Sequence, residues 1–302
     1  MSDQNNSLSK FEIWMLAARP KTLPAAAASA ILGSALALHD GKFHLLPAII
    51  ALIISILLQV GANFANDLFD FQRGADAPDR LGPLRVTQAG LLTPRQVTNG
   101  IILVIGVSTS LGIYLAINSG WLVILIGIFA IVAALTYTGG PFPFGYHSLG
   151  DLFVLIFFGF AAVCGTYFVQ AGSISSASIW GGLAMGLLIT NILVVNNLRD
   201  IDSDRLANKR TLAVRMGIRW TRVEYSLFVL IAYVLPVILV IDTNTYLGSF
   251  LTWFSIPYAI SLIKEIYQVE GRSLNKTLAG TARLALIYSL LFSTGILFLN
   301  FF

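Results

Sequence analysis

Residues 97–138 read VTNGIILVIGVSTSLGIYLAINSGWLVILIGIFAIVAALTYT. This stretch belongs to a longer run, from Gln96 to Gly150, that contains no Lys, Arg, Asp or Glu. About 20 apolar residues in a helix cross a bilayer, so the run is long enough to cross twice. The turn signal Asn118-Ser119-Gly120 lies near its middle. We therefore expect two transmembrane helices joined by a tight turn.

A second charge-free run covers residues 152–198, with the turn signal Ala171-Gly172-Ser173 near its middle. Over all 302 residues, 56% are hydrophobic and only 11% are charged, whereas an ordinary soluble domain has about 25% charged residues. This composition excludes a soluble globule, and one membrane anchor would not account for it. The single cysteine, Cys164, excludes an internal disulfide and a cysteine-based metal site.

The sequence predicts an all-α polytopic membrane protein that forms a single domain over residues 1–302. The apolar runs indicate nine transmembrane helices, at about 22–38, 45–66, 97–117, 121–138, 152–170, 177–197, 225–241, 245–263 and 284–301.

Basic residues set the expected orientation, because Lys and Arg are retained on the cytoplasmic side of a membrane. With the N-terminus in the cytoplasm, 18 of the 19 Lys and Arg residues fall in cytoplasmic connections, and only Lys42 falls outside. This division supports an odd number of spans, since removing one internal span would send later basic clusters to the outer face.

A first acidic motif ends the second predicted span and reads Asn63-Phe-Ala-Asn66-Asp67-Leu-Phe-Asp70. At about 100° per residue, Asn63, Asp67 and Asp70 lie within roughly 60° of one another around a helix. The spacing therefore predicts a polar ridge at the cytoplasmic end of a hydrophobic helix.

A second acidic motif ends the sixth predicted span and reads Asn196-Asn-Leu-Arg199-Asp200-Ile-Asp202-Ser-Asp204. Asn196, Asp200 and Asp204 share one helical face, while Asp202 points roughly the opposite way. The two ridges lie four spans apart, so each half of the chain resembles a four-helix unit with one ridge, and this favours the hypothesis of a duplication.

Two carboxylate clusters at helix ends repel each other and are costly beside hydrocarbon unless a cation lies between them. Aspartate oxygens without His or Cys suit Mg²⁺, which bridges carboxylates to phosphates. Arg85, Arg199 and Lys209 would suit the remaining phosphate charge. The pattern predicts ionisation of a diphosphate ester at the membrane surface. The alternative is that the acids are solvated loop charges in weak surface ion pairs.

At these residues the chain resembles the UbiA superfamily of intramembrane aromatic prenyltransferases, whose aspartate-rich motifs match Asn66-Asp67-x-x-Asp70 and Asp200-x-x-x-Asp204. Further stretches resemble the 1,4-dihydroxy-2-naphthoate polyprenyltransferase branch of that superfamily. They are Arg19-Pro-Lys21-Thr-Leu23, the PDRLGPLR of residues 78–85, the TYTGGP of residues 136–141 with Tyr146 and Leu149-Gly150-Asp151, and Asn196-Asn-Leu-Arg199-Asp200.

The resemblance implies helices around a central, lipid-accessible cavity in a bacterial inner membrane, with the active site on the cytoplasmic side. It implies transfer of a polyprenyl group from a polyprenyl diphosphate to 1,4-dihydroxy-2-naphthoate, with loss of CO₂ and diphosphate. The product would be demethylmenaquinol, a precursor of menaquinone (vitamin K). Membrane lipid is an expected partner and nucleic acid is not.

The resemblance also implies roles for individual residues. Catalysis and Mg²⁺ binding would fall to Asp67, Asp70, Asp200 and Asp204, with Asn63 and Asn66 as neutral metal partners. The diphosphate would be bound by Arg85, Arg199 and Lys209, and the acceptor by Arg19, Lys21, Tyr137, Tyr146 and Asp151. For the basic and tyrosine members of the acceptor group, anchoring at the membrane interface is an alternative role.

Two alternatives to this function stay open. The acceptor of a UbiA-type enzyme can be another aromatic acid, such as 4-hydroxybenzoate or homogentisate. A cation-coupled transporter also carries intramembrane carboxylates, but it is expected to place them near the bilayer midplane in broken helices. The two acidic ridges are expected at one membrane face, which disfavours transport.

Overall fold

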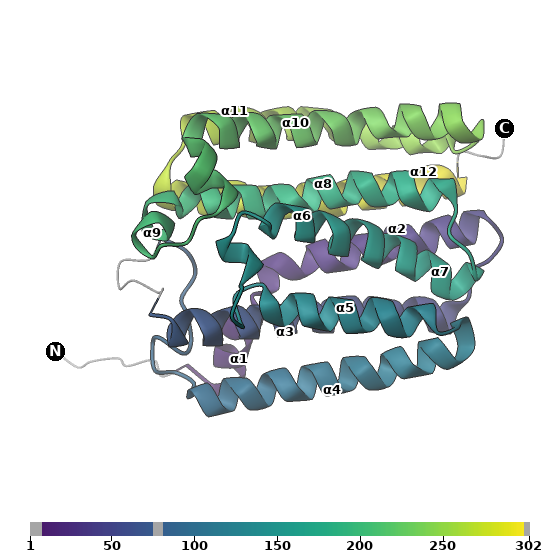
Figure 1. The fold of residues 1–302 in the computed structure, drawn as a ribbon. Coiled ribbons are helices and arrows are strands. Elements are labelled where there is room, and N and C mark those ends of the chain that lie inside the picture. Colours follow the sequence, from purple (N-terminus) through teal and green to yellow (C-terminus); the bar gives the residue numbers. More distant parts are fainter. Residues whose placement is uncertain (1–7, 75–80, 299–302) are drawn as a thin grey trace.

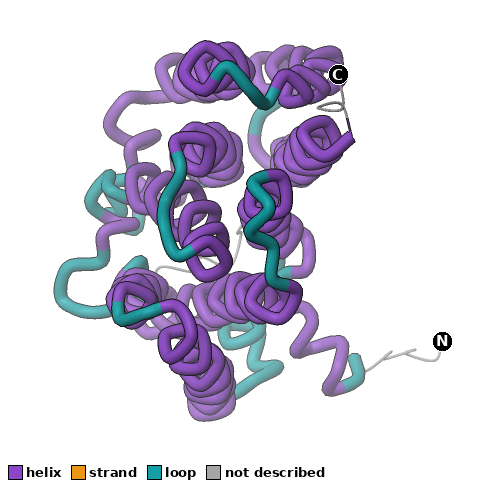
Figure 2. Tube along the Cα trace, turned by 90° about the vertical axis from the view of Figure 1, so that its right-hand side faces the viewer, coloured by secondary structure: helices purple, strands orange, loops and turns teal. Residues whose placement is uncertain are grey.

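A computed structural model describes residues 8–74 and 81–298, which contain helices and no strand. The long helices lie side by side with their axes roughly aligned (Figure 1), and Figure 2 views the bundle along them. The α-helices are α1 (Lys10–Ala18), α2 (Leu23–His39), α3 (Leu45–Gln72), α4 (Pro94–Ser119), α5 (Leu122–Thr136), α6 (Gly150–Val154), α7 (Gly165–Ala171), α8 (Ser176–Arg199), α9 (Ile201–Leu206), α10 (Leu212–Thr243), α11 (Ile256–Gln268) and α12 (Leu274–Phe298).

Shorter helical segments complete the bundle. A π-helical segment, η3 (Leu155–Cys164), joins α6 to α7, and the 3₁₀ segments are η1 (Pro20–Thr22), η2 (Phe144–Tyr146), η4 (Leu247–Ser255) and η5 (Gly271–Ser273).

Seven helical stretches of the described chain are long and apolar enough to cross a membrane, which confirms the prediction of an all-α polytopic protein. The predicted span at 121–138 is the apolar helix α5, whose 15 residues fall short of that length. The predicted span at 245–263 is divided between η4 and α11, because Pro257 has no amide hydrogen and opens a new helix there. The count of nine spans stays a prediction.

The two predicted tight turns are confirmed by the helix ends. α4 ends at Gly120, whose φ of 101° suits glycine, and α5 begins two residues later. α7 ends at Gly172 in the left-handed conformation with φ 71°. Ser175 then opens α8 through a capping box with Ser178.

Glycines allow the η3 segment to pack tightly against α8. A Cβ atom on Gly159 would lie 2.6 Å from the carbonyl oxygen of Gly182, and one on Gly186 would lie 2.8 Å from the carbonyl oxygen of Leu155. Backbones approach this closely in membrane bundles where small residues form the contact. The same η3 segment forms one wall of a cavity inside the bundle.

Candidate active site

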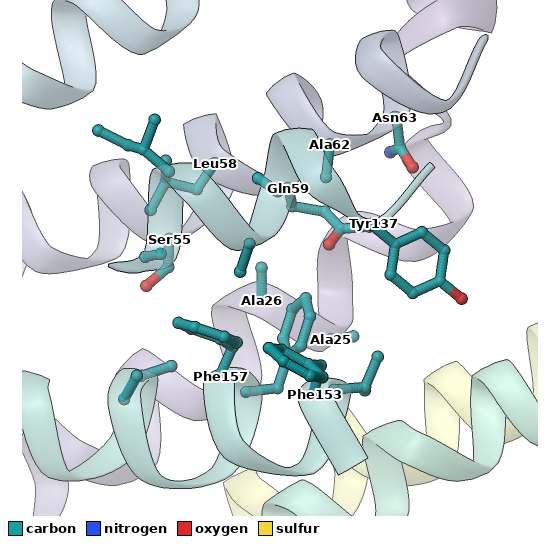
Figure 3. A pocket seen from close by; sticks show the side chains of 18 of the residues that line it. Ala25, Ala26, Ser55, Leu58, Gln59, Ala62, Asn63, Tyr137, Phe153 and Phe157 are labelled. Carbon is teal, nitrogen blue, oxygen red and sulfur yellow. The ribbon is translucent and has the colours of Figure 1, made fainter. Parts of the chain in front are cut away.

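A cavity of about 450 Å³ lies among α2, α3, α4, α5, η3 and α8. Most of its wall is apolar. Figure 3 shows Leu58 and Ala62 on one side and Phe153 and Phe157 on the other, with Asn63 and Tyr137 towards one end. That end is polar, and the charged or amide residues lining the cavity include Arg19, Asn63, Asn66, Asp70, Arg85, Asn196, Asp200, Asp204 and Lys209. The cavity therefore suits an apolar chain with an anionic head group.

Asp70 anchors the polar end from α3. Its side chain is buried, and its Oδ2 accepts a hydrogen bond from Arg85 Nη2 at 2.6 Å. Its Oδ1 accepts a second from the Tyr146 hydroxyl at 2.8 Å. One turn earlier, Asn66 Oδ1 accepts from Thr138 Oγ1 at 2.9 Å. The end of α3 is thus joined to the loops that follow α3 and α5.

Asp67 is turned away from the cavity and does not line it. Its two carboxylate oxygens accept hydrogen bonds from the amides of Val86 at 3.1 Å and Thr87 at 2.9 Å. On the helix, Asp67 is rotated about 40° from Asn63 in one direction, whereas Asn66 is rotated about 60° in the other. Asp67 therefore holds the turn that presents Arg85.

Asn63 connects α3 to the start of α2. Its amide Nδ2 donates to the carbonyl of Ala18 at 2.9 Å and to Thr22 Oγ1 at 3.3 Å. Between these partners the backbone of Arg19 adopts the left-handed conformation with φ 53°. Asn63 thus lines the cavity and also fixes the segment that carries Arg19.

Arg199 holds the second acidic motif in place. Its guanidinium donates to both oxygens of Asp200, at 2.8 Å from Nε and 2.5 Å from Nη2. It also donates to Asn275 Oδ1 at 2.7 Å and to Asn196 Oδ1 at 2.8 Å. Arg199 does not line the cavity, whereas Asp200 does. Four hydrogen bonds to protein partners indicate that Arg199 orients Asp200.

Asp204 faces the cavity from α9. Its side chain is buried, and Lys209 Nζ lies 3.5 Å from its Oδ1. Burial raises the pKa of the Asp204 carboxyl to about 6, an effect that Lys209 opposes and that Asp200 and Asp70 reinforce. Asp70 acts from the other half of the chain, so the two acidic motifs come within electrostatic reach of each other. Asp202 is 87% exposed beside Arg205, on the opposite side as its position predicts.

The five residues expected at the acceptor lie in different environments. Arg19 and Tyr137 line the cavity, while Lys21, Tyr146 and Asp151 do not. Lys21 is exposed, and Tyr146 is buried beside Asp70. Asp151 is buried at the start of α6, and its Oδ2 has no hydrogen-bond partner among the described residues.

The ring of Tyr137 is confined by two glycines. A Cβ on Gly145 would lie 2.9 Å from Tyr137 Cε1, and one on Gly150 would lie 3.1 Å from its hydroxyl. The Phe144 ring meets it edge-on, with centroids 5.8 Å apart. Tyr137 therefore has a fixed position in the cavity wall.

Several polar residues with a place in the site were not predicted from the sequence. Ser55 and Gln59 continue the line of Asn63 towards the bilayer interior, and both line the cavity. Their signal was the four-residue spacing of polar side chains inside an apolar span. Thr138 also lines the cavity, whereas Asn275 does not and instead accepts a hydrogen bond from Arg199. Helical spacing does not indicate either role, because both depend on contacts between distant segments.

Carboxylate and amide oxygens at the polar end are the hard ligands that Mg²⁺ prefers. Asp70, Asp200 and Asp204 all line the cavity, and Asn66 and Asn196 add amide groups. Within residues 8–74 and 81–298 no three acidic, His or Cys side chains are gathered closely enough to hold a metal by themselves. Mg²⁺ usually keeps waters and bridges few carboxylates to phosphates, so the oxygen donors that line this end fit a Mg²⁺ ion shared with a bound anion.

The helical bundle, with its apolar cavity and aspartate-rich polar end, defines a multi-pass membrane protein whose cavity suits an amphiphile with an anionic head. The chain belongs to the UbiA prenyltransferase family, whose profile matches residues 26–293.

Curated relatives resemble the chain over most of its length. It is 38% identical to the 1,4-dihydroxy-2-naphthoate octaprenyltransferase of Haemophilus influenzae over 95% of this chain and 96% of the relative. The identity to the Escherichia coli protein of the same name is also 38%, over 96% of each chain. For the Bacillus subtilis protein of that name it is 30%, over 94% of this chain and 92% of the relative.

Solved structures share the fold. A UbiA homolog from Aeropyrum pernix matches with a TM-score of 0.68 and 18% identity, over 96% of this chain and 98% of that one. A UbiA homolog from Archaeoglobus fulgidus bound to DMAPP and Mg²⁺ matches with a TM-score of 0.63 and 14% identity, over 93% and 99%.

Proposed function

We propose that this protein transfers a polyprenyl group from a polyprenyl diphosphate to 1,4-dihydroxy-2-naphthoate, releasing CO₂ and diphosphate and giving demethylmenaquinol for menaquinone biosynthesis. The observation that carries the proposal is an apolar cavity with Asp70, Asp200 and Asp204 at one end, in a chain 38% identical to octaprenyltransferases of that name.

At the polar end, Asp70, Asp200 and Asp204 would hold Mg²⁺ with the help of Asn66. The metal, when bound, supplies positive charge that stabilises the leaving diphosphate. Arg85 and Lys209 line the same end and would bind the phosphate oxygens. Arg199, Asp67 and Asn63 would act indirectly, because their hydrogen bonds hold Asp200, the turn that carries Arg85 and the segment that carries Arg19.

The apolar part of the cavity would hold the prenyl chain and exclude water. When the carbon–oxygen bond breaks, its electron pair leaves with the diphosphate and an allylic cation remains. The faces of Phe153 and Phe157 can stabilise such a cation electrostatically. Exclusion of water keeps the cation available for the aromatic acceptor.

The acceptor ring then supplies the electron pair for a new carbon–carbon bond to the prenyl group. The bond to its carboxylate breaks, CO₂ leaves, and that electron pair restores the aromatic ring. Starting from the carboxylate form, no net proton is released. Arg19 and Tyr137, which line the cavity, are the proposed contacts of the acceptor.

The proposed location is a bacterial inner membrane, with the polar end of the cavity on the cytoplasmic side. The support is the distribution of basic residues, since 18 of 19 fall in connections on the side of the two acidic motifs. Labelling of single cysteines placed in these connections would test the orientation.

A competition assay tests the choice of acceptor. Purified protein in liposomes would receive Mg²⁺, a polyprenyl diphosphate and equal amounts of 1,4-dihydroxy-2-naphthoate, 4-hydroxybenzoate and homogentisate. We expect prenylated naphthoquinol as the main product. A prenylated benzoate or homogentisate product as the main species would overturn the naphthoate assignment.

A further inference from the structure

Tyr146 occupies a central position between the two acidic motifs. It lies in η2, and its side chain is buried. Its hydroxyl donates to Asp70 Oδ1 at 2.8 Å. The Lys209 ammonium lies 5.3 Å from the centre of its ring, and the Arg73 guanidinium lies 5.4 Å from it. Both distances are in the range of cation–π attraction.

Hydrogen bonds to backbone carbonyls also connect the loop that contains Tyr146 to the end of α3 and to the loop after α9. The amide of Arg210 donates to the Tyr146 carbonyl at 3.0 Å, and Ser148 Oγ donates to the Arg210 carbonyl at 2.6 Å. On the other side, the Arg73 guanidinium donates to the carbonyl of Gly140. The α5–α6 connection therefore joins the end of α3 to the loop after α9, at one end of the bundle (Figure 1).

We propose that Tyr146 is a positioning residue that holds Asp70 and Lys209 in place for one magnesium diphosphate. This inference rests on the proposed function and replaces the acceptor-binding role that the sequence suggested. Tyr146 does not line the cavity, so it acts through its partners.

The contacts explain how one side chain does this. Asp70 accepts a hydrogen bond from Tyr146 on Oδ1 and one from Arg85 on Oδ2, and these two bonds fix the orientation of its carboxylate. Lys209 lies over the ring and 3.5 Å from Asp204, so the ring limits where the ammonium can go. A carboxylate from the first motif and a cation beside the second are thus fixed relative to each other.

Two variants separate the hydroxyl from the ring. Tyr146→Phe removes the hydrogen bond to Asp70 and keeps the ring beside Lys209 and Arg73, while Tyr146→Leu removes both the hydrogen bond and the ring. Tyr114→Phe is the matched control, because Tyr114 is 40% exposed on α4 and does not line the cavity.

The first test is binding of inorganic diphosphate with Mg²⁺ to the full-length protein in detergent, measured by calorimetry. We expect about tenfold weaker binding for Tyr146→Phe, the effect of losing one hydrogen bond to a charged group, and a further loss for Tyr146→Leu. Tyr114→Phe should match the wild type. Equal binding by wild type and Tyr146→Phe would overturn the proposal, and so would a wild type that binds no magnesium diphosphate.

The second test is steady-state kinetics with a prenyl diphosphate and the naphthoate. In Tyr146→Phe and Tyr146→Leu, the KM for the prenyl diphosphate and the Mg²⁺ concentration for half-maximal rate should be higher than in the wild type. The KM for the acceptor should stay the same. A rise in the acceptor KM alone would contradict the positioning role. A wild type that binds magnesium diphosphate but does not prenylate naphthoate would refute the proposed function and leave the binding test of Tyr146 intact.

Discussion

At the scale of single residues, the acids at the polar end of the cavity each have a protein partner. Asp70 pairs with Arg85, Asp200 with Arg199, and Asp204 with Lys209. Such pairing offsets the cost of burying carboxylates. A magnesium diphosphate carries charges of both signs, so it can take the place of some of these pairs without leaving a buried charge uncompensated.

Substitutions of Asp204 and Asp202 test which face of this helical segment serves the site. Asp204→Asn removes a buried, cavity-lining carboxylate, and we expect turnover to fall by about 100-fold or more, because metal-assisted stabilisation of a leaving group contributes several kcal/mol. Asp202→Asn changes an exposed side chain two residues away and should lower turnover less than threefold, as roughly expected for a surface change. Equal losses measured in parallel rate assays would show that the face assignment is wrong.

The pKa of Asp204 gives a pH dependence for metal binding. Burial raises this pKa to about 6, so the carboxyl takes up a proton as the pH falls through that value and then competes with Mg²⁺. We expect the apparent affinity for Mg²⁺ to weaken below about pH 6 and to be recovered at higher Mg²⁺ concentration. Titrations of activity with Mg²⁺ at several pH values would show this, and an affinity that does not change between pH 5 and pH 7 would contradict it.

At the scale of elements, the η3 segment matters because it carries Phe157 and Phe158 into the cavity wall. Its position depends on α8, where Gly186 leaves no space for a Cβ beside the Leu155 carbonyl. The π-helical geometry of η3 widens the helix at this point, a feature often found near functional sites.

Gly186→Ala should push η3 away from α8. We expect a lower unfolding temperature and a higher KM for the prenyl diphosphate, because the cavity wall shifts. Gly106→Ala on α4 is the control, since a Cβ there meets no atom within 4 Å, and it should be neutral or slightly stabilising. Thermal unfolding of Gly186→Ala at the wild-type temperature would contradict the packing argument.

Helices and their ends could be predicted from the sequence where charge-free apolar runs and turn residues define them. The charge-free runs and the turns at Gly120 and Gly172 correspond to observed helices and helix ends. The predicted span 45–66 is shorter than α3, which extends to Gln72 because polar residues continue the helix beyond its apolar part. The kink of α10 at Gly217, with φ 78°, leaves no hydropathy signal.

The site was predictable as a set of residues but not as a set of contacts. Helical spacing placed Asp200 and Asp204 on one face, and both line the cavity. Spacing did not show that Asp67 turns to the amides of residues 86 and 87, or that Tyr146 reaches Asp70, because those partners lie 19, 20 and 76 residues away in the chain.

At the scale of the whole molecule, polar contacts tie helices together at the end opposite the acidic motifs. Asp40 follows α2 and accepts hydrogen bonds from Tyr167 of α7 and Tyr246 before η4, each at 2.5 Å. His39 Nδ1 lies 3.0 Å from the carbonyl oxygen of Ile296 in α12. These contacts connect four helical elements far from the polar end of the cavity.

Asp40→Ala should therefore weaken the bundle and spare the diphosphate site. We expect the unfolding temperature to fall by about 2–5 °C from the loss of two hydrogen bonds, with unchanged binding of magnesium diphosphate. Asp242→Ala provides a control, because Asp242 is an exposed acid that accepts hydrogen bonds from Ser176 and Trp180. A smaller stability loss for Asp40→Ala than for Asp242→Ala would contradict the role of this cluster.

The proposed prenyl transfer is tested most directly by the ratio of CO₂ to diphosphate released when the acceptor is carboxyl-labelled 1,4-dihydroxy-2-naphthoate. Purified protein in liposomes, with a polyprenyl diphosphate and Mg²⁺, should release one labelled CO₂ for each diphosphate. Chelation of Mg²⁺ should stop both releases, and adding it back should restore them. Folded protein that releases neither product, or that releases diphosphate without CO₂, would contradict the account.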